Sequence, residues 1–324
     1  MNLHLDTKAF QNAILAASQG LKILPVFIKK DYWITLVLKR LSDSKYVNSV
    51  VFKGGTSLSK GFKLINRFSE DVDIAVLNAS ELSGNQLKTL IRTVEKEVAQ
   101  DLKEKDVAGV TSKGSRFRKA VYQYPDTQTK KAENILTNII IVEINSFANP
   151  YPYNNRTIQS LIGEHLQINN QFDLIQKYRL QSFQVNVLDK NQTLLEKIVS
   201  LLRFSLAEDY LDSLSAKVRH FYDIHYLLRD SDCNVYFNSG EFAKNITGLI
   251  RHDRDTFDDP EGWQEKSINQ SPLLQNFDSV WNNLKAIYVK ELSNLVFTEI
   301  PDEKEIAESF KKIVAKLGKN DTKL

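Results

Sequence analysis

Two aspartates spaced two residues apart follow a pair of glycines in the stretch Val51–Val76, which reads VFKGGTSLSKGFKLINRFSEDVDIAV. An apolar run ends at Gly54 and Gly55, a helical pattern follows, and a second apolar run begins at the aspartates. The pattern predicts strand, turn, helix and strand. Asp71 and Asp73 then share one face of their strand. Neighbouring carboxylates repel unless a cation lies between them, and hard oxygen ligands suit Mg²⁺ carried with nucleotide phosphates.

The glycine turn has its own chemical use. Paired glycines let the backbone turn sharply and approach a ligand closely. The turn leads into a helix N-terminus, where N–H groups and the helix dipole favour a phosphate. Thr56 and Ser57 add hydroxyls that could cap this helix or hold a phosphate oxygen. The competing interpretation is a simple turn followed by two solvated aspartates.

A third carboxylate stands inside the apolar run 139–144, which reads IIIVEI and is strongly β-prone. A lone glutamate in a buried strand is costly unless it is paired or bound to a metal. Glu143 is therefore a candidate metal ligand. The alternative is a residue that faces solvent from an edge strand.

The segments GGTSLSK and SEDVDI together resemble the first signature of the nucleotidyltransferase superfamily, a Gly-Ser-type turn followed by Asp-x-Asp. The longer wording GGTSLSK…RFSEDVDI is most similar to the AbiEii/AbiGii-type nucleotidyltransferase toxins of type IV toxin–antitoxin and abortive-infection pairs. The resemblance implies an NTP substrate and Mg²⁺, as one ion or two, held by Asp71, Asp73 and Glu143. It also implies a nucleotide-binding set composed of Lys53, Gly54, Gly55, Thr56, Ser57, Lys60 and Lys197.

Two later stretches resemble further signatures of the same family. In the helical pattern 193–202, Lys197 shares a face with apolar residues, where a lysine needs an anionic partner. The stretch KVRHFYDIH at 217–225 supplies Asp223. The resemblance implies that Lys197 binds triphosphate, that Asp223 supports catalysis and that Arg219 contacts phosphate. A salt bridge between the two helices is the alternative and does not exclude a role in the site.

A basic strand is the candidate RNA contact. Residues 113–131 carry six Lys/Arg against one acid, and the residues from 116 to 122 alternate like a strand. Basic side chains interleaved with tyrosines suit a phosphate backbone, whereas a solvated edge strand guarded by lysines is the alternative. Together with Arg219, the RNA-binding candidates are Lys113, Arg116, Arg118 and Lys119.

The elements that must position these residues follow from periodicity. Residues 1–42 predict two helices, and in the second of these Lys30 and Asp31 could either line the nucleotide pocket or begin an exposed helix. Residues 80–105 predict a helix over one face of the sheet, and 182–188 a strand that returns to it. We expect an α+β fold, with a nucleotidyltransferase-type mixed sheet flanked by helices. We place the nucleotidyltransferase core in residues 1–150 and a mainly helical C-terminal domain, contributing Lys197 and Asp223, in 151–324.

Composition sets the remaining bounds. The chain has 324 residues, a formal net charge of +3 and one cysteine, so it predicts neither a disulfide framework nor, by charge alone, a nucleic-acid binder. The sequence shows no signal peptide and no apolar run that approaches 18 residues, which predicts a cytoplasmic protein without a membrane span.

The resemblance implies transfer of a nucleotide from an NTP to RNA, at the 3′ end of tRNA, which blocks translation, and a cognate antitoxin as partner. Nucleotide transfer onto a protein side chain is the first alternative. A non-catalytic nucleotide-binding regulatory module is the second, and the intact acidic set argues against it.

Overall fold

The computed structural model describes residues 1–69, 71–125 and 138–318. The chain divides into two compact units, one of residues 1–63 and 68–188 and the other of residues 64–67 and 189–324. We describe each unit by itself. The helices of the described ranges include none that is both long and apolar enough to cross a membrane.

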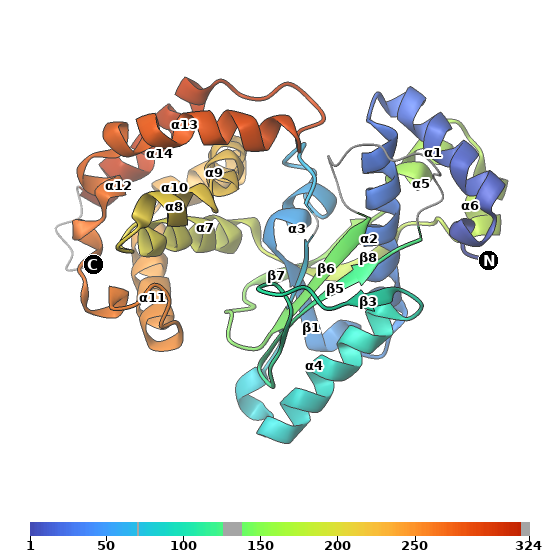
Figure 1. Ribbon diagram of the computed structural model, residues 1–324, viewed down its shortest axis with the longest axis horizontal. Helices are drawn as coiled ribbons and strands as arrows, with labels where there is room; N and C mark the ends of the chain where they lie inside the picture. Colours follow the sequence, from blue (N-terminus) through green and yellow to red (C-terminus); the bar gives the residue numbers. More distant parts are fainter. Residues whose placement is uncertain (70, 126–137, 319–324) are drawn as a thin grey trace. The chain divides into compact units, whose positions relative to one another are not determined.

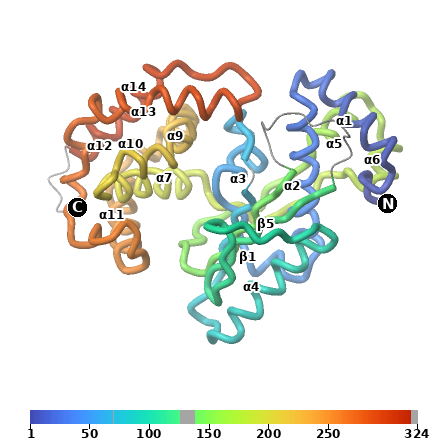
Figure 2. Tube along the Cα trace, in the orientation of Figure 1, coloured from blue at the N-terminus to red at the C-terminus, as the bar shows by residue number. Residues whose placement is uncertain are grey.

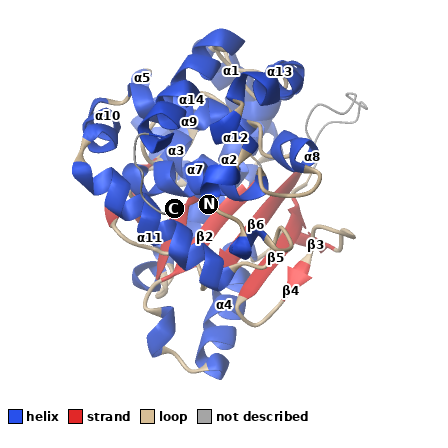
Figure 3. Ribbon diagram, turned by 90° about the vertical axis from the view of Figure 1, so that its left-hand side faces the viewer, coloured by secondary structure: helices blue, strands red, loops and turns tan. Residues whose placement is uncertain are grey.

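The first unit is built on a mixed sheet in the order β3-β5-β6-β2-β1-β8-β7, with β4 beside β5. Figure 3 shows its strands β2, β6 and β5 side by side. The β1–β8 and β2–β6 pairs are parallel and the other pairs are antiparallel. The strands are β1 Val50–Lys53, β2 Asp71–Val76, β3 Lys103–Lys105, β4 Ser112–Lys113, β5 Phe117–Gln123, β6 Ile139–Asn145, β7 Tyr153–Ile158 and β8 Phe183–Leu188.

Helices of the first unit pack on this sheet and on one another (Figure 1). Side chains start two of them: Asp6 caps α1, and Ser83 forms a capping box with Gln86 at α4. Helix α2 contacts α4 and β8, and α4 contacts β5 and β6. The helices are η1 Leu3–Leu5, α1 Thr7–Leu21, α2 Pro25–Asp43, η2 Val47–Ser49, α3 Gly54–Lys60, η3 Ala79–Glu81, α4 Gly84–Ala99, α5 Leu161–Ile168 and α6 Phe172–Tyr178.

The predicted strand, turn, helix and strand are present as β1, α3 and β2, and Figure 2 follows the chain from β1 into α3. Burial alternates along β6, where Ile140, Val142 and Ile144 are buried and the residues between them are partly exposed. Alternation places these three side chains on one face and Glu143 on the other. The face that carries the apolar side chains is the core face of this part of the sheet.

The second unit is helical. Its core packs aromatic side chains from three helices, with ring centroids of Phe221 and Phe310 4.9 Å apart and those of Phe277 and Phe310 5.0 Å apart. Its helices are α7 Lys190–Phe204, α8 Tyr210–Ser215, α9 Arg219–Arg229, α10 Ser231–Asn238, α11 Gly240–Thr256, η4 Trp263–Glu265, η5 Ile268–Gln270, α12 Pro272–Gln275, α13 Phe277–Ser293 and α14 Glu303–Gly318.

The division of the chain lies further along than the sequence placed it. The sequence predicts a boundary near residue 150, but β7 pairs with β8, and β8 pairs with β1. The sheet therefore continues to Leu188, and the helical unit begins at Asp189.

Candidate active site

Four charged residues lie in one row across strands β1, β2, β6 and β5. Lys53 is the register partner of Asp73, Asp73 that of Glu143, and Glu143 that of Lys119. Directly paired residues of neighbouring strands project on the same face of a sheet. The neighbouring residue Arg118 shows which face this is, because its side chain pairs with Glu95 of α4, with 2.5 Å between Nε and Oε2. The row thus lies on the face of the sheet opposite α4.

The carboxylates of the row act strongly on one another. The pKa of Asp73 is raised well above its ordinary value, first because the group is buried and then because Glu143 and Asp71 add negative charge beside it. Lys53 and Lys119 oppose this increase. The Lys119 ammonium lies 3.4 Å from Glu143 Oε2. Asp73, Glu143 and Asp71 thus share this face, close enough for their charges to act on Asp73.

Gly54 is the position where the chain makes room for these acids. Its φ is +79°, a backbone conformation that disfavours any residue with a Cβ. A Cβ built there would lie 2.0 Å from Asp73 Oδ2, closer than any real contact. The first glycine of the motif is thus required both by the turn and by the carboxylate packed against it.

The two hydroxyls of the turn are used within the protein. Thr56 Oγ1 donates to the carbonyl of Asp71 over 2.5 Å, and Ser57 Oγ donates to the carbonyl of Gly54 over 2.8 Å. Both residues are buried, and the N-cap position of α3 is Lys53 rather than either of them. Their observed role is to fix the start of β2 and the first turn of α3. The first-turn N–H groups of α3 have no intrahelical acceptors by geometry.

Lys60 and Asp31 form a buried ion pair in the first unit. Lys60 Nζ lies 2.6 Å from Asp31 Oδ1 and donates to the carbonyl of Gln159 over 2.8 Å. The other oxygen of Asp31 accepts from the N–H of Leu161 over 2.7 Å. Burial raises the pKa of Asp31, against the charge of Lys60. This arrangement ties α3 to α2, and it places Asp31 and its neighbour Lys30 inside the protein rather than at an exposed helix start.

In the second unit, Lys197 and Asp223 are joined by a third residue, Arg67. Lys197 Nζ lies 2.6 Å from Asp223 Oδ2, while Arg67 donates from Nε and Nη2 to the two carboxylate oxygens over 2.7 and 2.6 Å. All three side chains are buried. Burial alone would raise the pKa of Asp223, but the two cations hold it well below its ordinary value. The predicted salt bridge between helices is present.

Arg67 had no assigned role in the sequence analysis. It stands in the quoted stretch RFSEDVD, four residues before Asp71. The usable signal was Asp223 itself, because a carboxylate on the buried face of a helix needs compensating charge. Arg219 is half-buried at the start of α9. Burial, together with the charge of Lys197, lowers the pKa of the following residue, His220, well below its ordinary value.

The basic strand divides between several partners. Lys113 pairs with Glu104 over 2.8 Å at the surface, Arg118 faces α4, and Lys119 belongs to the charged row. The carbonyl of Arg116 accepts from Ser146, while its side chain is exposed. The part of the segment from 126 to 131 lies outside the described residues.

The donor chemistry of Asp71, Asp73 and Glu143 fits a hard divalent cation, because all three offer carboxylate oxygens and their mutual repulsion is what such an ion would relieve. In their present positions, the His, Cys, Asp and Glu side chains of residues 1–69, 71–125 and 138–318 form no group of three or more that could hold a metal ion. Glu143 is paired with Lys119 instead.

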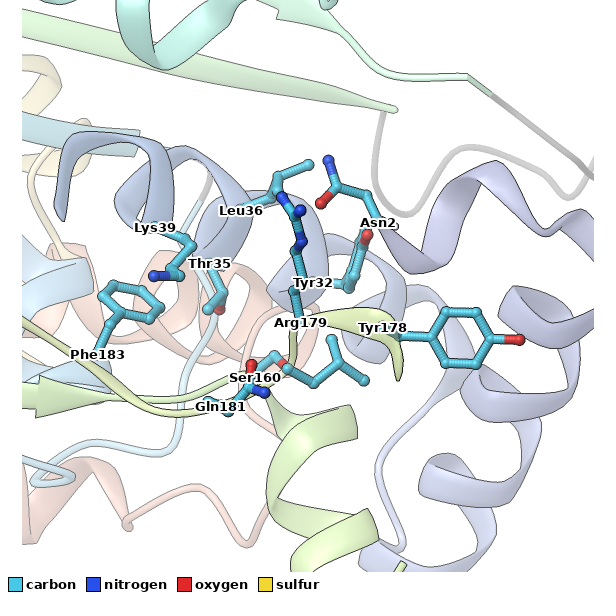
Figure 4. A pocket seen from close by; sticks show the side chains of 11 residues that line it. Asn2, Tyr32, Thr35, Leu36, Lys39, Ser160, Tyr178, Arg179, Gln181 and Phe183 are labelled. Atoms are coloured by element: carbon cyan, nitrogen blue, oxygen red, sulfur yellow. The ribbon is translucent and has the colours of Figure 1, made fainter. Parts of the chain in front are cut away.

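A separate small cavity of about 30 Å³ lies in the first unit between α2 and the segment that joins α6 to β8. Figure 4 shows Lys39 and Thr35 of α2 and Arg179 around it. Its lining includes none of the residues of the charged row. Within the part of the chain that the structure describes, the buried Thr35 hydroxyl has no hydrogen-bond partner.

Comparison with known proteins identifies the architecture. The family model described as "Nucleotidyl transferase AbiEii toxin, Type IV TA system" matches residues 36–319, most of the chain. The chain belongs to the AbiEii nucleotidyltransferase toxin family. The expectation of this family from the sequence is therefore confirmed, and the chain is a nucleotidyltransferase toxin of a type IV toxin–antitoxin system.

One solved structure of similar fold is MenT4, a nucleotidyltransferase toxin from Mycobacterium tuberculosis H37Rv. It is 17% identical in sequence with a TM-score of 0.54, and the match covers 96% of this chain and 90% of MenT4. At this identity the likeness concerns the fold, and it confirms the α+β class with a mixed sheet flanked by helices. The comparison with curated proteins gives no significant match to this AbiEii-family chain.

Proposed function

We propose that this AbiEii-family toxin transfers a nucleotide from an NTP to the 3′ end of tRNA and so blocks translation. The observation that carries the proposal is the in-register pair of Asp73 and Glu143, with Asp71 on the same strand face, packed against Gly54. Family membership supports nucleotide transfer. The tRNA acceptor rests on the family resemblance, and the exposed Arg116 and Lys113 of the basic strand are compatible with an RNA backbone.

In this proposal the two acids of the charged row, together with Asp71, are the ligands of Mg²⁺. Asp71, Asp73 and Glu143 would hold the ion, which when bound neutralises charge on the triphosphate and lowers the barrier to in-line attack. The first turn of α3 offers main-chain N–H groups to the phosphates, and Lys53 adds positive charge at the end of the row. Thr56, Ser57 and Lys60 act through the position of this turn, since their polar atoms already bond within the protein.

For Lys197 and Asp223, family resemblance supports a role in the reaction, with Lys197 binding triphosphate. The buried triad with Arg67 supports a second, structural role in the helical unit. Arg219 is a further proposed phosphate contact. An antitoxin partner is implied by membership of a type IV family, and we propose that the product of the same operon fills this role.

The test is incubation of the purified protein with each α-³²P-labelled NTP, Mg²⁺ and either total RNA or total protein. Label in tRNA-sized RNA, lost after chelation of Mg²⁺, supports the proposal. Label in a protein band instead would replace it with transfer onto a side chain. No label from any of the four NTPs would leave a nucleotide-binding regulatory module as the function.

A further inference from the structure

Three lysines in the protein pair with acids considered for the site, and their pairings differ in tightness. Lys60 lies 2.6 Å from Asp31 and Lys197 lies 2.6 Å from Asp223, and in both pairs the partners are almost fully buried. Lys119 lies 3.4 Å from Glu143. Its side chain is 31% exposed and that of Glu143 is 24% exposed. Lys119 is thus the one of these three that holds its acid loosely.

The length and burial of each ion pair determine the free energy that is needed to separate its lysine from its acid. A charge-assisted bond between an ammonium and a carboxylate is normally about 2.7–2.9 Å long. A longer pair that water reaches on both sides contributes little, typically below about 1 kcal/mol. Separation of Lys60 or Lys197 from its partner would strand a buried charge, whereas Lys119 and Glu143 can separate into water at small cost.

Lys119 lies where its separation from Glu143 would affect the acidic side chains of the site. It is the direct cross-strand partner of Glu143, which is itself the partner of Asp73. The row and Asp71 together carry three negative and two positive charges, so Lys119 reduces the repulsion among the acids when no ion is bound. A divalent cation would compete with this ammonium for the same carboxylate.

We propose that Lys119 is a built-in counter-ion of the acidic site. In the metal-free protein its ammonium pairs with the Glu143 carboxylate. When a divalent cation binds, Lys119 separates from Glu143 and contacts the phosphates of the nucleotide. This inference rests on the proposed function, because it assumes that the row binds a cation and an NTP. It makes Lys119 a counter-ion of Glu143 and a nucleotide contact rather than an RNA contact.

The test is titration of Mn²⁺, as a spectroscopic substitute for Mg²⁺, into the full-length protein without nucleotide, followed by electron paramagnetic resonance. Lys119→Met removes the competing cation, so we expect Mn²⁺ to bind about 3- to 10-fold more tightly, from the loss of one positive charge a few ångströms away. In labelling assays the same variant should show a KM for NTP raised several-fold, because the phosphate contact is lost. Tighter metal with weaker nucleotide is a split that mere loss of structure would not give.

Two variants serve as controls. Lys119→Arg keeps the charge and should leave Mn²⁺ affinity within about twofold of wild type. Lys311→Met removes the same charge from surface pairs with Asp278 and Glu308 in the helical unit and should change neither quantity. Thermal denaturation checks that each variant is folded.

Unchanged or weaker Mn²⁺ binding by a folded Lys119→Met variant would overturn the inference while leaving the proposed function intact. A wild-type protein that labels RNA but binds no Mn²⁺ would overturn the inference and the assignment of the metal ligands. A wild-type protein that binds Mn²⁺ with the predicted Lys119 dependence but labels nothing would support the inference about the cation and contradict only the transfer reaction.

Discussion

Removal of the Asp223 carboxylate should strongly destabilise the helical unit. In Asp223→Ala, the buried cations Arg67 and Lys197 lose the acid that both contact at 2.6–2.7 Å. Removal of one partner from a buried ion pair costs about 3–5 kcal/mol, because the remaining charge is uncompensated. Two stranded cations place the cost at or above that range. For a domain of 150–250 residues this corresponds to a fall of roughly 6–20 °C in Tm.

The companion variant Lys197→Met gives the contrast. Asp223 keeps both bonds to Arg67, so no buried charge is stranded, and the loss is that of one bond to a charged group, about 1.5–3 kcal/mol. The expected order of Tm is therefore wild type, then Lys197→Met, then Asp223→Ala. A Lys197→Met protein that is folded at 25 °C but has lost labelling would establish that Lys197 also serves the reaction.

Thermal denaturation followed by circular dichroism at 222 nm provides the assay, with proteolysis to check that each variant is compact. The reasoning is refuted if Asp223→Ala melts within about 2 °C of wild type. It is also refuted if Lys197→Met is less stable than Asp223→Ala, since that order would contradict the pairing of Asp223 with both Arg67 and Lys197.

Three further predictions concern other residues. Gly54→Ala should lower the free energy of unfolding by about 1–2 kcal/mol, because it places a Cβ at positive φ, and should displace Asp73, so that labelling falls by more than tenfold. The control Gly109→Ala, at φ +76° with open space around it, should lose a similar stability and keep its activity. Equal activity in both variants would contradict the contact between Gly54 and Asp73. The pKa of Asp223 is lower in the folded protein than its unfolded value of 3.8, so the stabilisation by Asp223 is complete above pH 3.8 and is lost as the pH falls towards the lower folded pKa. The Tm difference between wild type and Asp223→Ala should therefore stay constant from pH 7 to 5 and shrink below pH 4. A difference that disappears by pH 5 would be inconsistent with a lowered pKa of Asp223. Thr35→Val should raise stability by about 1 kcal/mol, because the hydroxyl is buried without a partner among the described residues, whereas a loss measured by the same melts would mean that the cavity supplies one.

Some features of the charged row could be predicted from the sequence, because the glycine turn and the alternation along each strand are local signals. A period of two along β2 and β6 determines which side chains share a face, and the glycine pair marks the turn. The register that pairs Glu143 with Asp73 joins distant segments, and the sequence pattern does not determine it. The local patterns thus predict the strands, the glycine turn and which side chains share a face.

Long-range pairings were beyond the sequence. Asp31 and Lys60 pair over a sequence separation of 29 residues, and Arg67 and Asp223 over one of 156. Neither ion pair is reflected in the periodicity of the sequence. Strand β7, Tyr153–Ile158, was missed for a different reason. It is an edge strand with mostly exposed polar side chains, held by main-chain pairing to β8, so the apolar alternation that identifies a strand is absent. The expected boundary near residue 150 rests on a stretch rich in proline and asparagine, which in the structure leads into β7.

The substitution Asp73→Asn tests the central claim most directly, when stability and labelling are measured on the same preparation. Asparagine keeps the shape of the side chain but removes a buried negative charge that Glu143 and Asp71 repel. The account predicts a Tm equal to or above that of wild type together with complete loss of nucleotide transfer. Transfer that persists at the wild-type rate in this variant would contradict the assignment of the acidic row as the active site.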